Sequence, residues 1–130
     1  MNIAVVGHGR MGRMLEQVCA QRDNVRVIGF VGQSRCTSLD ELADIDAAVD
    51  FSHPDNLQRT LESAVRRRIP LVIGTTGFSN VQSGDIHAAS QSIPIVWADN
   101  FSIGMTVFCR MARQMAQTLG ADFDMEIVET

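Results

Sequence analysis

The chain contains no lysine and no tyrosine, and all eleven of its basic residues apart from histidine are arginines. Schiff-base chemistry, a lysine general base and the phosphate-binding lysine of a Walker-type loop are therefore excluded within these 130 residues. Tyrosine, another side chain used for proton transfer, is missing as well. This stretch therefore supplies few of the groups that usually move protons in active sites.

Long apolar runs and clusters of positive charge are also missing. No run approaches the roughly 18–20 apolar residues of a membrane-spanning helix, and the N-terminus lacks the basic region of a signal peptide. We therefore expect a cytoplasmic protein without a membrane partner. The net charge is −4, and the only basic run, Arg66-Arg67-Arg68, is typical of a helix C-terminus. A nucleic-acid partner is not expected, because it would require clustered positive charge.

Cysteine is scarce and scattered. Cys19, Cys36 and Cys109 form no C-x-x-C pair, which suits a reducing compartment and excludes a metal site of that kind. Carboxylates alternate with apolar residues over 122–127, which is typical of the polar face of a strand rather than of a metal site. We expect no metal.

The sequence does contain a regular alternation of apolar runs and helical patterns. Helical spacing covers residues 11–18, 57–65, 81–89 and 107–120. This alternation predicts an α/β fold: a single domain, residues 1–130, with a Rossmann-like doubly wound parallel sheet. The runs expected as strands are NIAVV (2–6), VRVIGFV (25–31), AAVDFS (47–52), PLVIGTT (70–76), PIVWAD (94–99) and DMEIVE (124–129).

The first apolar run leads directly into GHGRMG, a G-x-G-x-x-G spacing that opens a helix. Gly7 is expected to make a sharp turn, Gly9 to let a diphosphate approach the backbone, and Gly12 to let the helix pack on the sheet. The amides of the helix N-terminus would face the anion. A tight turn without a ligand is the alternative. The apolar face of this helix is expected to pack on the core; it consists of Met11, Met14, Leu15 and Val18.

The end of the second expected strand bears on the choice of dinucleotide. NAD-binding domains usually carry a carboxylate there, whereas this chain continues through Gln33-Ser34-Arg35. Arg35 would face a 2′-phosphate, so we expect NADPH to be preferred over NADH. A solvated loop arginine is the alternative.

Small and hydroxyl-bearing residues follow three later strands. Ligands of doubly wound sheets bind beyond the carboxyl ends of the strands, so these residues are candidates for contact with a ribose and a nicotinamide. Ordinary turn chemistry would explain the same residue types. The three stretches are Phe51-Ser52-His53, Gly74-Thr75-Thr76-Gly77 and Asp99-Asn100-Phe101-Ser102.

Taken together, these segments resemble the N-terminal domain of the 4-hydroxy-tetrahydrodipicolinate reductase (dihydrodipicolinate reductase) family. The matching stretches occur in the family's order and span nearly the whole chain: GHGRMGR, VDFSHPD, VIGTTGF, ADNFSIGM and DMEIVET. GTTGF followed by NFSIGM is much more specific than the glycine spacing. These two segments speak against other amino-acid dehydrogenases, such as those acting on aspartate or homoserine, which share the glycine start.

The resemblance implies a reductase of the diaminopimelate and lysine route that uses NADPH or NADH on a small cyclic dicarboxylate. Thr76 would also reach a substrate carboxylate. Two departures from the family are a glycine loop one residue shorter than in some members and the missing acidic residue for the adenosine ribose. The implied cofactor contacts are Gly7, Gly9, Arg10, Met11 and Gly12 at the pyrophosphate, Phe51 and Ser52 beside the cofactor, Gly74, Thr75 and Thr76 at the nicotinamide ribose, and Asp99, Asn100 and Phe101 at the nicotinamide.

The same resemblance assigns the proton-donor histidine, the active-site lysine and most substrate contacts to a second domain beyond Thr130, which also builds the family's homotetramer. We therefore expect no catalytic residue in this chain, with His53 and His87 outside the chemistry. The chain is expected to bind a nicotinamide dinucleotide without turnover. Exposure of the face that meets the second domain would favour self-association. A stand-alone dinucleotide-binding or sensing module without catalysis is the alternative.

Overall fold

The structure, a computed structural model, describes residues 1–32 and 36–128. The chain divides into two compact units, Met1–Asp99 and Asn100–Thr130, and each is considered by itself. The assignment of residues 1–130 to one dinucleotide-binding domain stays a prediction. No helix within the described ranges is long and apolar enough to cross a membrane.

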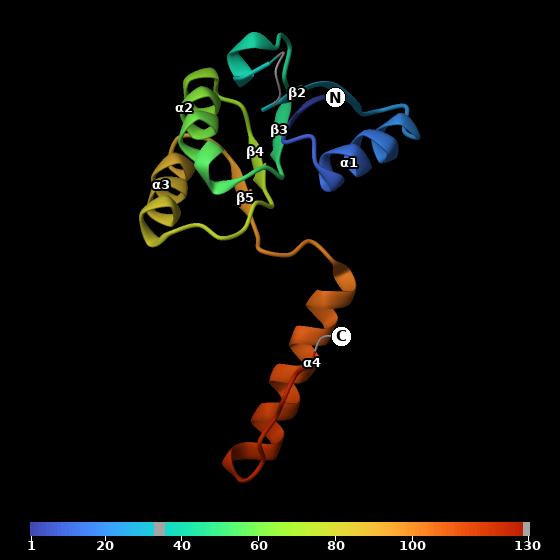
Figure 1. Cartoon of the computed structure of the whole chain (residues 1–130), viewed down its shortest axis with the longest axis vertical. Helices are drawn as coiled ribbons and strands as arrows, with labels where there is room; N and C mark the ends of the chain where they lie inside the picture. The colour runs from blue at the N-terminus through green and yellow to red at the C-terminus, as the bar shows by residue number, and fades with distance from the viewer. Residues whose placement is uncertain (33–35, 129–130) are drawn as a thin grey trace. The chain divides into compact units, whose positions relative to one another are not determined.

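The first unit alternates strands and helices from its first residue to its last (Figure 1). The second unit consists of one long helix and a short 3-10 helix. In chain order the elements are β1 (Asn2–Val6), α1 (Arg10–Ala20), β2 (Arg26–Val31), η1 (Leu39–Glu41), β3 (Ala47–Asp50), η2 (Pro54–Asn56), α2 (Leu57–Arg67), β4 (Leu71–Ile73), α3 (Asn80–Ser90) and β5 (Ile95–Trp97), then α4 (Ile103–Leu119) and η3 (Gly120–Asp122).

The five strands form one parallel sheet in the order β2-β1-β3-β4-β5. The predicted α/β class with a Rossmann-like parallel sheet is thereby confirmed. Val6 pairs with Val31 on one side and with Asp50 on the other, so the carboxyl ends of these strands lie level along one edge. The chain order reverses between β1 and β3, and the ligands of such sheets bind at that reversal.

Helices α2 and α3 cover one face of the sheet, and α1 lies on the other (Figure 1). The core under α2 and α3 is fully buried because the apolar side of α2 meets alternate residues of the strands; it includes Ala4, Val6, Ala48, Leu57, Leu61, Leu71, Ile73 and Ile86. Helix α2 ends at Arg67, and Arg68 takes the left-handed conformation with φ 55°. The arginine run thus ends a helix, as predicted.

The apolar face predicted for α1 is not buried. Met11 and Met14 are 48% and 53% exposed, whereas the buried residues of α1 are Gly12 and Cys19. The face of the sheet on that side shows the same lack of cover: a row of paired valines is buried at Val5 but 57% exposed at Val96. Helical periodicity identified α1 correctly, but it could not show how much of the sheet would be covered on this side.

The sixth strand predicted from DMEIVE is wrong for the residues that the structure describes. Residues 123–128 belong to no strand and pair with no other described segment. Phe123, the residue just before this run, has extended backbone angles (φ −128°, ψ 131°). A strand also needs a neighbour for its hydrogen bonds, and alternation alone cannot supply one.

Candidate functional site

The turn after β1 is built from glycines that touch other backbone atoms. Gly7 has φ +91°, and its N–H donates to the Val31 carbonyl at 2.8 Å. A Cβ on Gly7 would lie 2.5 Å from the Phe51 carbonyl oxygen, and one on Gly12 would lie 2.3 Å from the Gly7 carbonyl oxygen. Gly7 and Gly12 are therefore required by close backbone packing between the turn, α1 and the end of β3.

Gly9 differs from these two glycines because it faces open space. A Cβ on Gly9 would meet nothing within 4 Å. Gly9 is the N-cap of α1, so no side chain caps the helix, and its first turn holds no acidic residue. The first amides of α1, with the positive end of the helix dipole, thus have room for an anion beside Gly9.

A cleft of about 930 Å³ lies within the first unit, beyond the ends of β3 and β4. It brings together predicted cofactor contacts from three places: the start of α1, the loop after β3 and the loop after β4. These residues are Arg10, Met11, Phe51, Ser52, Gly74, Thr75 and Thr76. We call it the main cleft. Two more of its lining residues, His53 and Gly77, belong to the strand-end stretches named from the sequence. Its remaining lining residues were not singled out from the sequence; they are Pro54, Asp55, Phe78, Ser79 and Gln82.

The floor of the main cleft is closely packed. A Cβ on Gly74 would lie 2.1 Å from the ring of Phe51, so this ring can rest only against a glycine. Thr75 and Thr76 differ in exposure: Thr75 is buried, whereas Thr76 is exposed on the lining of the cleft. Thr76 is thus the threonine whose hydroxyl is open to a ligand.

Besides the three glycines of the turn, which do not line the main cleft, four further predicted site residues are not among its lining residues. Arg35 lies outside the described residues. Asp99 ends the first unit, and Asn100 and Phe101 belong to the second. Asn100 Oδ1 accepts from the Ser102 N–H at 2.6 Å, next to the N-terminus of α4. The contact of these residues with a cofactor stays a prediction.

The two histidines considered as acid–base groups have local partners. His53 Nδ1 accepts from the Asp55 N–H at 3.3 Å and caps η2. The ring of His87 lies edge-on to Trp97, with centroids 6.2 Å apart. Their predicted place outside the chemistry is compatible with these contacts and stays a prediction.

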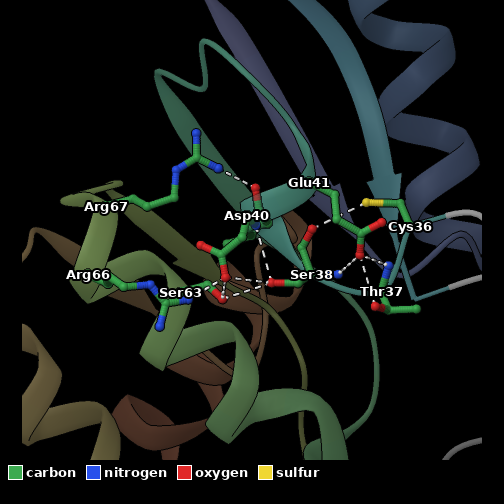
Figure 2. Close-up of polar contacts among 9 residues, drawn as sticks. Cys36, Thr37, Ser38, Asp40, Glu41, Ser63, Arg66 and Arg67 are labelled. Atoms are coloured by element: carbon green, nitrogen blue, oxygen red, sulfur yellow. Dashed lines mark hydrogen bonds and ion pairs between the residues drawn. The ribbon is translucent and has the colours of Figure 1, made fainter.

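A second hollow, too narrow as it stands to hold a water molecule, lies beyond the ends of β1 and β2, also within the first unit. One wall is formed by residues 37–39, part of a segment that a polar network holds against α2 (Figure 2). In that network Asp40 accepts from Ser38 and Ser63 and pairs with Arg66, and Arg67 donates to the Leu39 carbonyl. The lining residues are Val6, Val31, Gly32, Thr37, Ser38, Leu39, Asn56, Arg59 and Thr60.

The two carboxylates of η1 are engaged beside this hollow. Desolvation opposes ionisation of Asp40, but hydrogen bonds from Ser38, Ser63 and Arg66 lower its pKa below the ordinary value. Glu41 Oε1 accepts from the Thr37 N–H, the Thr37 hydroxyl and the Ser38 N–H at 2.8, 2.9 and 3.1 Å. These bonds, led by that of the Thr37 N–H, lower the pKa of Glu41, with a smaller contribution from Arg59.

A buried carboxyl, that of Asp50, lies under the main cleft. Asp50 is the last residue of β3 and is 1% exposed. Its Oδ1 accepts from the Ser52 N–H and from the Thr75 hydroxyl, both at 2.9 Å, and its Oδ2 has no partner among the described residues. Burial raises the pKa of Asp50, and the hydrogen bonds from Ser52 and Thr75 offset this only in part. Sequence reasoning missed this residue, because an aspartate at a strand end is also ordinary turn chemistry.

Replacing Asp50 with asparagine tests this raised pKa. When folding raises the pKa of a carboxyl, its contribution to the free energy of unfolding is fully present at pH values below its pKa in the unfolded chain. This contribution is lost as the pH rises through its pKa in the folded chain. The free energy of unfolding of Asp50→Asn, relative to the unmodified chain, should therefore increase from about pH 4 to about pH 7. Urea unfolding at both pH values measures it. A relative stability that stays constant or falls over this range would contradict the assignment.

The parallel sheet, the glycine turn and the two hollows at its carboxyl edge define the class: a Rossmann-like α/β domain. The family model for "Dihydrodipicolinate reductase, N-terminus" matches residues 1–101. The chain therefore belongs to the dihydrodipicolinate reductase family, whose members are oxidoreductases that use a nicotinamide dinucleotide. The resemblance inferred from the sequence motifs is confirmed.

Curated relatives agree with this assignment. The chain is 39% identical over its whole length to 4-hydroxy-tetrahydrodipicolinate reductase of Alkaliphilus oremlandii, covering 54% of that protein. It is 35% identical to the reductase of the same name from Pseudoalteromonas atlantica and 36% identical to that of Akkermansia muciniphila, covering 56% and 52% of them with 98% and 99% of its own length. The chain thus spans about half the length of the curated relatives it matches.

Proposed function

We propose that this chain is the nucleotide-binding part of a 4-hydroxy-tetrahydrodipicolinate reductase, acting in diaminopimelate and lysine biosynthesis in the cytoplasm. The observation that carries the proposal is the uncapped N-terminus of α1 beside Gly9, where a diphosphate has free access to backbone amides. The nicotinamide half of the ligand would lie in the main cleft, over Ser52 and Thr76. The adenosine half would lie across the second hollow, beyond β2.

Within this proposal, the chain's residues bind and orient a cofactor, and the bound cofactor supplies the hydride. Phe51 and Gly74 give the nicotinamide half a closely packed floor, and Thr76 offers a free hydroxyl toward the substrate side. The family resemblance assigns the proton donor and most substrate contacts to sequence beyond residue 130. We therefore propose that these 130 residues bind the dinucleotide without turning over the substrate.

A fluorescence titration tests binding. Trp97 is the chain's only tryptophan, and tyrosine is absent. Its ring lies 5.9 Å, centroid to centroid, from that of Phe78, which lines the main cleft. NADPH or NADH should therefore quench Trp97 emission saturably, because reduced nicotinamide absorbs where tryptophan emits. A folded chain that binds neither nucleotide would refute the proposed function.

Turnover is measured separately, as loss of reduced nicotinamide after 4-hydroxy-tetrahydrodipicolinate is added to the nucleotide-loaded chain. No loss above the enzyme-free rate is expected. Steady turnover would overturn the proposed inactivity while leaving nucleotide binding intact.

We further propose that NADPH is preferred over NADH, and that Arg59 contributes to this preference together with Arg35. Arg59 lines the second hollow and donates to Asn56 Oδ1 at 3.2 Å, but among the described residues no carboxylate lies within 4 Å of it. Asp40 and Glu41 are both engaged with other donors. Arg59 thus makes no ion pair within the described part of the chain, although its charge contributes to the lowered pKa of Glu41, and it lies at the place where a 2′-phosphate would lie.

Arg59→Gln should weaken NADPH binding about tenfold and leave NADH binding nearly unchanged, because only NADPH carries the extra phosphate. Calorimetric titration with both nucleotides measures the ratio of the two dissociation constants. Arg22→Gln is the matched control. Arg22 lies between α1 and the start of β2, at the opposite edge of the sheet from the carboxyl ends of the strands. An unchanged ratio in Arg59→Gln would contradict the proposed role of Arg59 but not the proposed binding of a dinucleotide.

A further inference from the structure

The loops after β3 and β4 meet above one buried side chain, that of Asp50. Asp50 pairs with Val6 of β1 and with Ile73 of β4, so it lies in the middle of the sheet at the carboxyl edge. Its carbonyl accepts from the Gly74 N–H at 2.9 Å. The backbone of Asp50 therefore connects both neighbouring strands just where the main cleft begins.

The side chain of Asp50 extends this connection into the two loops. Oδ1 holds the Ser52 N–H from the loop after β3 and the Thr75 hydroxyl from the loop after β4. The Ser52 N–H also lies 2.8 Å from Thr75 Oγ1, which closes a three-membered network. Ser52 and Thr75 line the main cleft, whereas Asp50 does not. Asp50 can therefore act on a ligand only through these two residues.

The cost of burying this carboxyl indicates a role beyond packing. A buried polar oxygen without a partner destabilises a fold, and Oδ2 of Asp50 is such an atom within the described part of the chain. No charged side chain contributes to the environment of this carboxyl among the described residues; the groups that act on it are Ser52 and Thr75. Among the described residues, the side-chain hydrogen bonds of this buried aspartate thus all go to the two loops.

We propose that Asp50 is a positioning residue of the dinucleotide site, which fixes the loops after β3 and β4 in the arrangement that receives the nicotinamide half. The proposal rests on the proposed function, because it assumes that a dinucleotide binds along this edge. It assigns Asp50 no contact with the ligand. Its effect is therefore confined to the half of the ligand that lies over Ser52 and Thr75.

Two ligands separate this effect from a general loss of structure. NADPH spans both halves of the site, whereas adenosine 2′,5′-bisphosphate occupies only the adenosine half. Asp50→Ala should weaken NADPH about tenfold and change the affinity for adenosine 2′,5′-bisphosphate less than twofold, and Asp50→Asn should recover most of the loss because its amide oxygen still accepts. Calorimetry of the unmodified chain and the two variants with both ligands, on samples whose folding is checked by circular dichroism, gives the six affinities.

Thr75→Val provides an independent variant if Asp50→Ala does not fold. Valine keeps the shape of threonine but removes the hydroxyl that bonds Asp50, so it should reproduce the selective loss of NADPH affinity, and Thr75→Ser should restore it. Arg59→Gln should give a different pattern, since it weakens both ligands. Arg22→Gln should weaken neither.

The outcomes distinguish this inference from the proposed function. If the unmodified chain binds neither ligand, the proposed function fails, and the role of Asp50 fails with it. If the unmodified chain binds both and the folded Asp50 and Thr75 variants bind NADPH normally, only the positioning role is overturned. It is likewise overturned if the variants lose affinity for both ligands equally, because that pattern indicates a purely structural residue.

Discussion

Gly12→Ala, at the one glycine of α1, is expected to destabilise the first unit strongly. The added methyl group would lie 2.3 Å from the Gly7 carbonyl oxygen, which is backbone and cannot rotate away. Helix α1 would have to shift off the turn, at a cost of about 2 kcal/mol in the free energy of unfolding. The shift would also move the N-terminal amides of α1, so NADPH binding should be lost. Urea unfolding and nucleotide titration measure the two effects.

Gly84→Ala is the matched control for this substitution. Gly84 also lies within a helix, α3, but a Cβ there would meet nothing within 4 Å. Alanine should therefore stabilise the first unit by about 0.5–1 kcal/mol, which is its ordinary advantage over glycine in a helix. A Gly12→Ala variant that is as stable as Gly84→Ala would show that the close contact between α1 and the turn is wrong.

Gly9→Ala is expected to have the largest effect on binding without a comparable effect on folding. Gly9 has φ −77°, which alanine adopts readily, and a Cβ there has open space around it. The cost to stability should be about 0.5 kcal/mol, because alanine is a poorer N-cap than glycine. The methyl group would occupy the space in which a diphosphate approaches the amides, so NADPH and NADH should both bind at least about tenfold more weakly.

The same unfolding and calorimetric measurements check Gly9→Ala. The decisive comparison is with Gly12→Ala, which should lose stability and binding together, whereas Gly9→Ala should lose binding alone. Undiminished affinity of Gly9→Ala for both nucleotides would mean that the diphosphate does not lie at this turn, and the proposed function would then lose its main support.

Much of the fold follows from local patterns, and these were confirmed. The apolar runs at 2–6, 25–31 and 47–52 became β1, β2 and β3, and the arginine run ended α2. The strands at 47–52, 70–76 and 94–99 were predicted two to four residues too long, because the turn residues that follow each paired segment continue its residue pattern. The strand predicted from DMEIVE was wrong because, within the described part of the chain, no neighbouring strand pairs with it.

The candidate site was only partly predictable for a related reason. The glycine spacing and the strand-end residues indicated the main cleft, because parallel strands bring their carboxyl ends to one edge. Nothing in the spacing separated Thr75, whose hydroxyl is committed to a buried carboxyl, from its exposed neighbour Thr76. Nor did it single out Arg59, which reaches the second hollow from a helix rather than from a strand end.

The sequence by itself determined which catalytic side chains are absent from these residues, the alternation of strands and helices, and the turn that opens α1. Each of these depends on residues close together in the chain, where composition and periodicity act directly on backbone conformation. The tertiary structure alone decided that Asp50 joins Ser52 to Thr75, that Asp40 fastens η1 to α2, and that the apolar face of α1 is left exposed. These outcomes depend on which strands become neighbours and how far each helix covers the sheet, and residues distant in sequence set both.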